Sequence, residues 1–72
     1  MKMNIVLLKS QIVLHNKRLI DVAEKLNISK SALYRKLNGK TEFTRREIEI
    51  LIKYLDLSIE TSMEIFFKQK VS

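Results

Sequence analysis

The chain has 72 residues, of which 14 are Lys or Arg and 8 are Asp or Glu, so its formal net charge is +6 at pH 7. A chain of this length buries only about 60% of its unfolded surface and has one small core, which leaves no room for a large active-site pocket. Because it contains no Cys, disulfides and thiolate metal sites are excluded. We therefore expect residues 1–72 to form a single domain whose partner is a polyanion, with nucleic acid ahead of anionic lipid.

An apolar run near the N-terminus is too short to interact with a membrane as a signal or a span. The run covers residues 5–8 and ends at Lys9. A secretory signal needs about 7 to 15 apolar residues, and a membrane-spanning helix needs about 20. We expect a soluble, intracellular protein with no membrane partner.

The near absence of helix breakers predicts an all-α fold, because the chain has no Pro and one Gly. We expect about five short helices, the first over residues 4–15 with Ile5, Leu8 and Ile12 facing inward and Asn16 ending it. This helix carries more apolar residues than one buried face requires, namely Val6, Leu7, Val13 and Leu14. Either two other helices pack on it, or it contacts another subunit.

Residues 21–39 have the pattern of two short helices joined by a tight turn. In the first helix, Val22, Ala23 and Leu26 recur at helical spacing. Asn27 tolerates the left-handed conformation that ends a helix. Ser29 is placed to cap the next helix.

The second helix of this pair is predicted to be held down by Leu33 and Leu37, which are four residues apart. It is expected to stop at Asn38-Gly39. Positions 30 and 34, like positions 31 and 35, then lie in adjacent rows on the outward side. The residues of these rows are Lys30, Ser31, Tyr34 and Arg35.

Two further helices complete the predicted bundle. Thr44 and Glu47 fit a capping box, in which each side chain binds the free backbone amide of the other residue, and Phe43 with Ile48 fits the accompanying hydrophobic staple. The buried stripe of this helix is Ile48, Leu51, Ile52 and Leu55. A last helix is expected over residues 59–67, and residues 68–72 are expected to fray. The residues available in it to close the core are Met63, Phe66 and Phe67.

Taken together, these elements resemble the Cro and phage-repressor type of helix-turn-helix domain, the XRE family, over nearly the whole chain. The motifs that carry the resemblance are Val22–Leu26, the Ile28-Ser29 turn, Asn38-Gly39-Lys40 and the closing Glu64–Phe67. Residues 32–43 look especially like short regulators from prophages of low-GC Gram-positive bacteria. The resemblance implies a lambda-repressor-like bundle with its helix-turn-helix at about 19–38.

The resemblance also implies that the start of the second helix of the pair, the recognition helix, contacts DNA bases. Lys30 and Ser31 occupy those positions, with Arg35 one turn later. Arg35 can donate two parallel hydrogen bonds to guanine, and Lys30 can make a looser contact. Ser31 can contact a base or a phosphate, and Tyr34 can contact a thymine methyl or a phosphate.

Contacts to the DNA backbone are expected from residues around this helix. The resemblance places Asn38 and Lys40 there, and Arg45 and Arg46 lie at a helix N-terminus, which favours anions. Arg18 replaces by charge a glutamine that usually contacts phosphate in the family. Because Arg18 and Leu19 stand where the family has Ser or Thr and then Gln, the start of the second helix stays open.

A separation of charge along the chain supports a DNA-facing side. Between positions 30 and 46 the one acid is Glu42, and the other carboxylates of the second half lie downstream. Lys36 belongs to this basic segment, but Lys36-Leu37 departs from the family's usual apolar-then-glutamate order, so the outward face can shift by one residue. The cations of the segment are Lys30, Arg35, Lys36, Lys40, Arg45 and Arg46.

Three kinds of binding explain these features. The first is sequence-specific binding to double-stranded DNA by a Cro-like or prophage repressor that acts at an operator as a homodimer, with half-sites about 34 Å apart. The second is a protein-interaction module, such as an antitoxin or an antirepressor partner. The third is non-specific RNA or membrane-surface binding. Candidate dimer contacts are Ile50, Tyr54, Ile59 and Met63.

Catalysis has no support in the sequence, because no Ser or Thr has a His-acid constellation and no glycine-rich loop is present. We expect no enzyme activity, no cofactor and no small-molecule ligand. His15 is a lone histidine without partners at metal-ligand spacing, so a structural role is expected there and no metal site. The expected location is the cytoplasm of a bacterium, on nucleoid DNA, with a bacterial or phage-encoded gene.

Overall fold

Helix α1 begins at a side-chain cap and ends at a left-handed asparagine. In the computed structural model, which describes residues 3–67, α1 covers Ile5–Leu14. The side chain of Asn4 accepts a hydrogen bond from the backbone N–H of Leu7 at 3.1 Å, and Asn16 has a φ of 59°. These ends confirm the predicted helix and its stop. The expected fraying of residues 68–72 lies outside the described residues.

Helices α2 (Leu19–Leu26) and α3 (Lys30–Leu37) form the predicted helix-turn-helix pair. Asn27 ends α2 in the left-handed region, with a φ of 59°. The Ser29 hydroxyl accepts a hydrogen bond from the backbone N–H of Ala32 at 3.0 Å and so caps α3. The turn is therefore fixed by two local residues, as the sequence predicts.

The start of α2, which the sequence leaves open, lies at Leu19 with Arg18 as its cap position. The backbone N–H of Arg18 donates a hydrogen bond to Asp21 Oδ2 at 2.9 Å. This contact is the half of a capping box in which the acid at the third helical position binds back to the cap residue. Asp21 therefore compensates for the missing Ser or Thr.

Helix α4 covers Arg45–Tyr54 and has the complete capping box expected at its start. Thr44 Oγ1 accepts from the Glu47 N–H at 3.1 Å, and the Thr44 N–H donates to Glu47 Oε1 at 2.8 Å. Leu51 and Leu55 of its predicted stripe are fully buried, and Ile48 with Ile52 packs partly buried against the core.

The last helix differs from the prediction in its second half. Helix α5 (Ile59–Ser62) continues into the π-helical turn η1 (Met63–Phe67). Met63 and Phe67 remain 48% and 47% exposed, whereas Ile65 and Phe66 are buried. The buried positions Ser62, Ile65 and Phe66 are spaced i, i+3 and i+4, so the inward side of this segment lies one residue before the predicted one. The expectation that Met63 and Phe67 close the core is therefore wrong.

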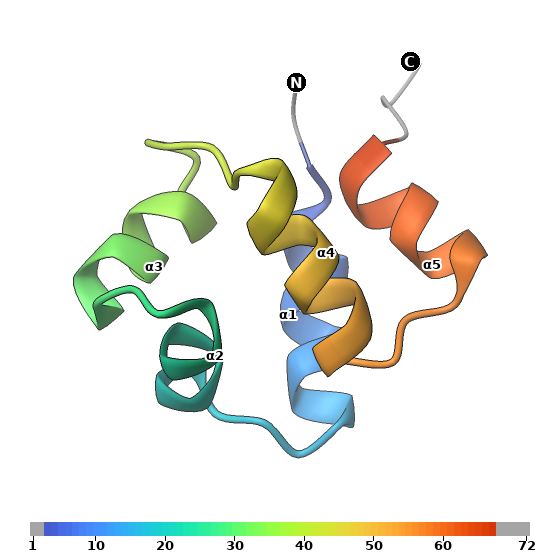
Figure 1. Ribbon diagram of the computed structural model, residues 1–72. Coiled ribbons are helices and arrows are strands. Elements are labelled where there is room, and N and C mark those ends of the chain that lie inside the picture. The colour runs from blue at the N-terminus through green and yellow to red at the C-terminus, as the bar shows by residue number, and fades with distance from the viewer. Residues whose placement is uncertain (1–2, 68–72) are drawn as a thin grey trace.

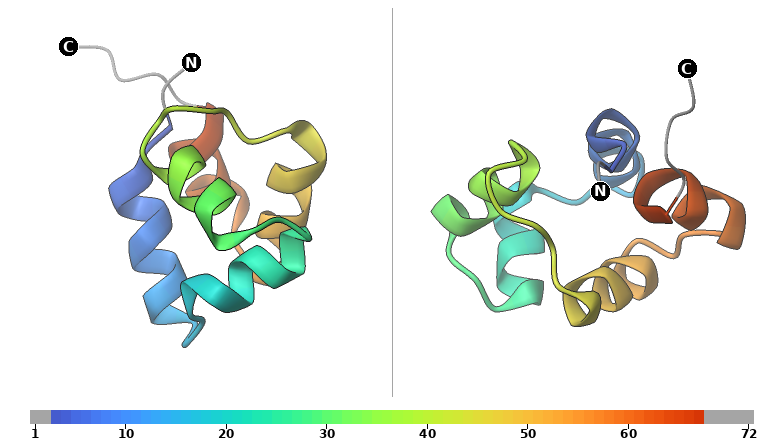
Figure 2. Two further views of the ribbon diagram at one scale, coloured as in Figure 1. Left: turned by 90° about the vertical axis from the view of Figure 1, so that its left-hand side faces the viewer. Right: turned by 90° about the horizontal axis from the view of Figure 1, so that it is seen from above.

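The helices divide the molecule into two ends joined by α1 and α4 (Figure 1). The α2–α3 pair lies at one end and α5 at the other, and the two further views agree (Figure 2). The Asn4 N–H donates to the Ile65 carbonyl at 2.8 Å, which ties the start of α1 to η1. The described residues contain helices and no strand, so the fold class is all-α as predicted. No helix of the described region has both the length and the apolar character needed to cross a bilayer.

Candidate nucleic-acid interface

The outward side of α3 presents the predicted base-contacting residues together. Leu33 and Leu37 are 0% and 3% exposed and hold the helix on the core, so the opposite side must face solvent. In the view of Figure 2 that is turned about the vertical axis, α3 lies in front of the rest of the molecule. The exposed residues of this side are Lys30, Ser31, Tyr34 and Arg35.

The turn after α3 carries the next two candidates, Asn38 and Lys40, and both are exposed. Gly39 lies between them with a φ of +78°, a conformation that an L side chain rarely adopts. The Lys40 N–H donates to the Arg35 carbonyl at 2.9 Å, so Lys40 is held next to the end of the recognition helix.

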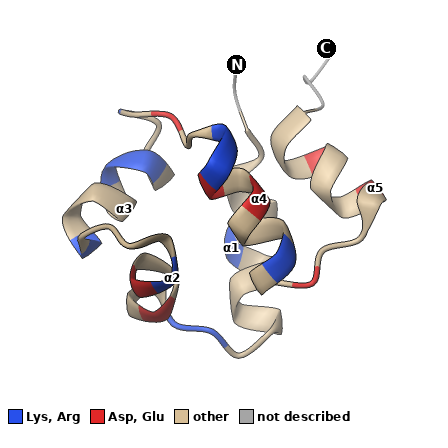
Figure 3. Ribbon diagram, in the orientation of Figure 1, with Lys and Arg blue, Asp and Glu red and all other residues tan. Residues whose placement is uncertain are grey.

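The N-terminus of α4 contributes Arg45 and Arg46, which are also exposed. Figure 3 shows Lys and Arg on α3, in the turn that follows it and on the first turn of α4, whereas α5 carries only acidic charge. Arg45 is paired with an acid of its own helix, because its Nε lies 3.7 Å from Glu49 Oε2. The basic residues are thus concentrated on α3, the turn after it and the start of α4, but Glu47 and Glu49 lie among them and only α5 is purely acidic.

Arg18 lies at the start of α2 in an ion pair with Asp21. Its Nε is 3.2 Å from Asp21 Oδ2, and its side chain is 77% exposed. The side-chain hydrogen bond between them raises the pKa of Arg18 and lowers the pKa of Asp21. Arg18 therefore helps to fix the start of α2 while its exposed guanidinium stays open to solvent.

Lys36 does not belong to the exposed basic surface, although it lies in the basic segment of the sequence. Its Nζ lies 3.1 Å from Glu47 Oε1 and donates to the Glu42 carbonyl at 3.0 Å. The side chains of Lys36 and Glu47 are only 13% and 10% exposed. The Lys36 ammonium also lies 5.7 Å from the centroid of the Phe43 ring. The sequence pattern placed Lys36 among the cations of the basic segment and did not indicate this inward contact.

Glu47 remains ionised despite its burial. Burial alone would raise the pKa of this carboxyl group, but the hydrogen bonds from the Thr44 N–H and from Lys36 outweigh it and lower the pKa below the ordinary value. The carboxylate thus joins two elements, because it caps α4 and binds an ammonium group from α3.

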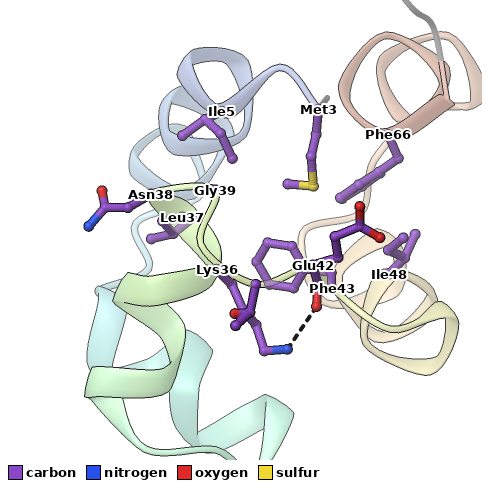
Figure 4. A pocket seen from close by; sticks show the side chains of 11 residues that line it. Met3, Ile5, Lys36, Leu37, Asn38, Gly39, Glu42, Phe43, Ile48 and Phe66 are labelled. Carbon is purple, nitrogen blue, oxygen red and sulfur yellow. Dashed lines mark hydrogen bonds between the residues drawn. The ribbon is translucent and has the colours of Figure 1, made fainter. Parts of the chain in front are cut away.

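An open groove adjoins this ion pair at the end of α3 (Figure 4). Met3 and Phe66 border it on one side, and the turn after α3 borders it on the other. Most of its lining is apolar and continuous with the core, and Lys36 and Glu42 are the two charged residues of the lining. The apolar lining residues are Met3, Ile5, Leu37, Phe43, Ile48 and Phe66.

This arrangement, a capped helix pair whose second helix exposes a polar and basic side, defines a helix-turn-helix protein. The sequence profile of the helix-turn-helix family matches residues 8–61, which is most of the chain. No curated protein and no solved structure matches this chain. The chain belongs to the Cro/C1-type helix-turn-helix family, also called the XRE family. This is a family of DNA-binding transcription regulators and not of enzymes.

Proposed function

We propose that this protein is a sequence-specific repressor of the Cro-like or prophage type, which binds an operator in double-stranded DNA. The observation that carries the proposal is the outward side of α3, where Lys30, Ser31, Tyr34 and Arg35 are exposed together. A major groove admits one α-helix, and its bases present hydrogen-bond acceptors to such side chains. Arg35 and Lys30 supply the base contacts to guanine, while Ser31 and Tyr34 contact a base or a phosphate.

The residues around α3 supply contacts to the DNA backbone. Asn38 and Lys40 flank the recognition helix at its end, and Arg45 and Arg46 begin α4. Backbone contacts of this kind fix the register of a protein on the duplex without reading its sequence. Arg18 adds a contact from the start of α2.

The proposed working form is a homodimer, because one recognition helix covers only a few base pairs. Ile50 and Tyr54 pack partly buried against the core, so they are weak candidates for a subunit contact. Ile59 and Met63 are 82% and 48% exposed on α5 and at the start of η1. We therefore place the dimer contact on these two residues, with half-sites about 34 Å apart.

The proposed site of action is nucleoid DNA in the cytoplasm of a bacterium, with the gene carried by a phage or by the bacterium itself. The proposal requires no cofactor and no small-molecule ligand. Repression follows from occupancy, because a protein bound to an operator blocks polymerase.

Selection of bound sequences from a random duplex library tests the proposal. The wild-type protein should enrich a palindrome, and Arg35→Ala should change the preferred base at one position in each half-site. Recovery of sequences without any shared motif would refute sequence-specific binding.

One observation favours a second candidate function, a protein-interaction module such as an antitoxin or an antirepressor partner. Val6, Val13 and Leu14 are 80%, 73% and 70% exposed on α1, so intramolecular packing does not explain them. An exposed apolar helix face is typical of a protein contact. If the library selection enriches no motif, substitution of these residues becomes the next experiment.

A further inference from the structure

A single carboxylate joins the recognition helix to the start of α4. Glu47 Oε1 accepts a hydrogen bond from the Thr44 N–H at 2.8 Å and lies 3.1 Å from Lys36 Nζ. The same ammonium donates to the Glu42 carbonyl at 3.0 Å, which lies in the segment between the two helices. Three contacts therefore fix the last turn of α3, the connecting segment and the first turn of α4 against one another.

The elements joined in this way carry most of the proposed DNA contacts. Arg35 precedes Lys36 on α3, and Arg45 and Arg46 precede Glu47 on α4. The connecting segment of residues 38–44 contains a glycine and no regular helix, and Phe43 anchors it in the core. The ion pair adds a direct polar contact between the two helix ends. A partly buried ion pair resists separation, because removal of one partner leaves an uncompensated charge away from water.

We propose that Lys36 and Glu47 are positioning residues, which do not touch DNA but set the recognition helix relative to the phosphate-contacting start of α4. This inference rests on the proposed function. It predicts that loss of the ion pair weakens specific binding, because base contacts and phosphate contacts can no longer form together with the same geometry.

Two carboxylates of α4 allow a test in which charge and positioning predict opposite results. Glu47→Gln and Glu49→Gln each remove one negative charge, so a purely electrostatic effect tightens DNA binding in both variants. Gln also retains the capping box at position 47. We expect Glu49→Gln to bind the selected operator more tightly, and Glu47→Gln to bind it about tenfold more weakly than wild type, with non-specific binding undiminished. Tighter operator binding by Glu47→Gln would overturn the proposal.

Lys36→Met tests the other partner, since Met keeps much of the apolar stem and removes the ammonium group. Its matched control is Lys9→Met, which removes the same charge from an exposed position on α1. We expect Lys36→Met to lose most of its preference for the operator, while Lys9→Met lowers specific and non-specific affinity by the same small factor. Equal discrimination in the two folded variants would contradict a positioning role.

Amide hydrogen exchange tests the same geometry without DNA. The Gly39 and Lys40 amides donate to the Lys36 and Arg35 carbonyls at 3.2 and 2.9 Å. In Glu47→Gln these two amides should exchange about tenfold faster, while the Leu8 amide in α1 keeps its protection. Unchanged exchange at both amides would refute the proposal even if the protein selected no DNA sequence. If these amides exchange faster but the protein selects no DNA sequence, the proposed function is refuted, while the result still supports a role of the ion pair in holding α3 against the start of α4.

Discussion

Arg45 Nε lies 3.7 Å from Glu49 Oε2, so a proposed phosphate contact of the free protein is already paired with a carboxylate. The side chains of Arg45 and Glu49 are 94% and 65% exposed, and such surface pairs are weak. A DNA phosphate can therefore displace Glu49, but the carboxylate also repels the approaching backbone. Glu49 thus limits the affinity of the proposed interface without blocking it.

Glu49→Gln should strengthen binding to every duplex by about two- to fivefold. An exposed ion pair contributes about 0.2–1 kcal/mol, and in this variant Glu49 no longer competes with a DNA phosphate for Arg45. Titration of the selected operator and of an unrelated duplex by fluorescence anisotropy measures this. Both affinities should rise by the same factor. A gain limited to the operator would show that Glu49 takes part in sequence discrimination.

Arg35→Ala and Lys40→Ala should have different effects on DNA binding. Loss of a bidentate base contact reduces discrimination at one base position by about 1–3 kcal/mol. Loss of a phosphate contact instead weakens binding to all sequences and lowers the slope of log affinity against log salt concentration by about 1. Binding to a panel of single-base operator variants at several salt concentrations separates the two effects. Identical profiles for both variants would contradict the division into base and backbone contacts.

Glu47 should make the fold sensitive to acid. Its folded pKa lies below the ordinary value of 4.5, so the unfolded chain binds the proton more readily. The resulting stabilisation is fully present above that ordinary value and is lost as the pH falls through the folded pKa. Urea denaturation across this range measures the free energy of unfolding. Glu47→Gln should show a shallower pH dependence than wild type, and parallel curves would exclude a contribution from Glu47.

Ser62→Ala should stabilise the protein. Ser62 is 6% exposed, and its Oγ is buried with no hydrogen-bond partner in the described region. An unpaired buried polar group costs about 1–3 kcal/mol, so its removal should raise the free energy of unfolding by about 1 kcal/mol. Urea denaturation checks this. The contrasting variant is Ser58→Ala, which removes a hydroxyl that accepts from the Thr61 N–H at 3.0 Å and should destabilise α5.

Ile59→Glu should dissociate the proposed dimer without unfolding the monomer, because Ile59 is 82% exposed. The matched variant is Val13→Glu, which places the same charge on the exposed side of α1. Sedimentation velocity should show a loss of dimer for Ile59→Glu alone. Dissociation by Val13→Glu and not by Ile59→Glu would place the subunit contact on α1.

Local patterns in the sequence predicted most of the helix ends correctly. The caps at Ser29 and Thr44 and the left-handed residues Asn16 and Asn27 depend on neighbours within a few positions, so sequence spacing is enough to find them. The exposed side of α3 follows from the burial of Leu33 and Leu37 in the same way, whereas its contacts with DNA bases stay predictions.

Local sequence patterns did not predict contacts between residues that are far apart in the chain. The basic segment contains Lys36, yet its side chain is paired with a carboxylate eleven positions later, which only the three-dimensional structure reveals. In the last helix Ile65 likewise lies in the core and Met63 does not, because the apolar residues of Met63–Phe67 fit more than one helical face. The exposure of Val6 and Val13 also could not be predicted without knowing which helices pack on α1.

The ratio of specific to non-specific affinity tests the central claim most directly. Wild-type protein would be titrated with the selected operator and with a scrambled duplex of equal length, at several salt concentrations. A sequence-specific regulator should prefer the operator by about 10³ or more at physiological salt. Equal affinities for the two duplexes, both abolished by added salt, would show binding by charge alone and contradict the account.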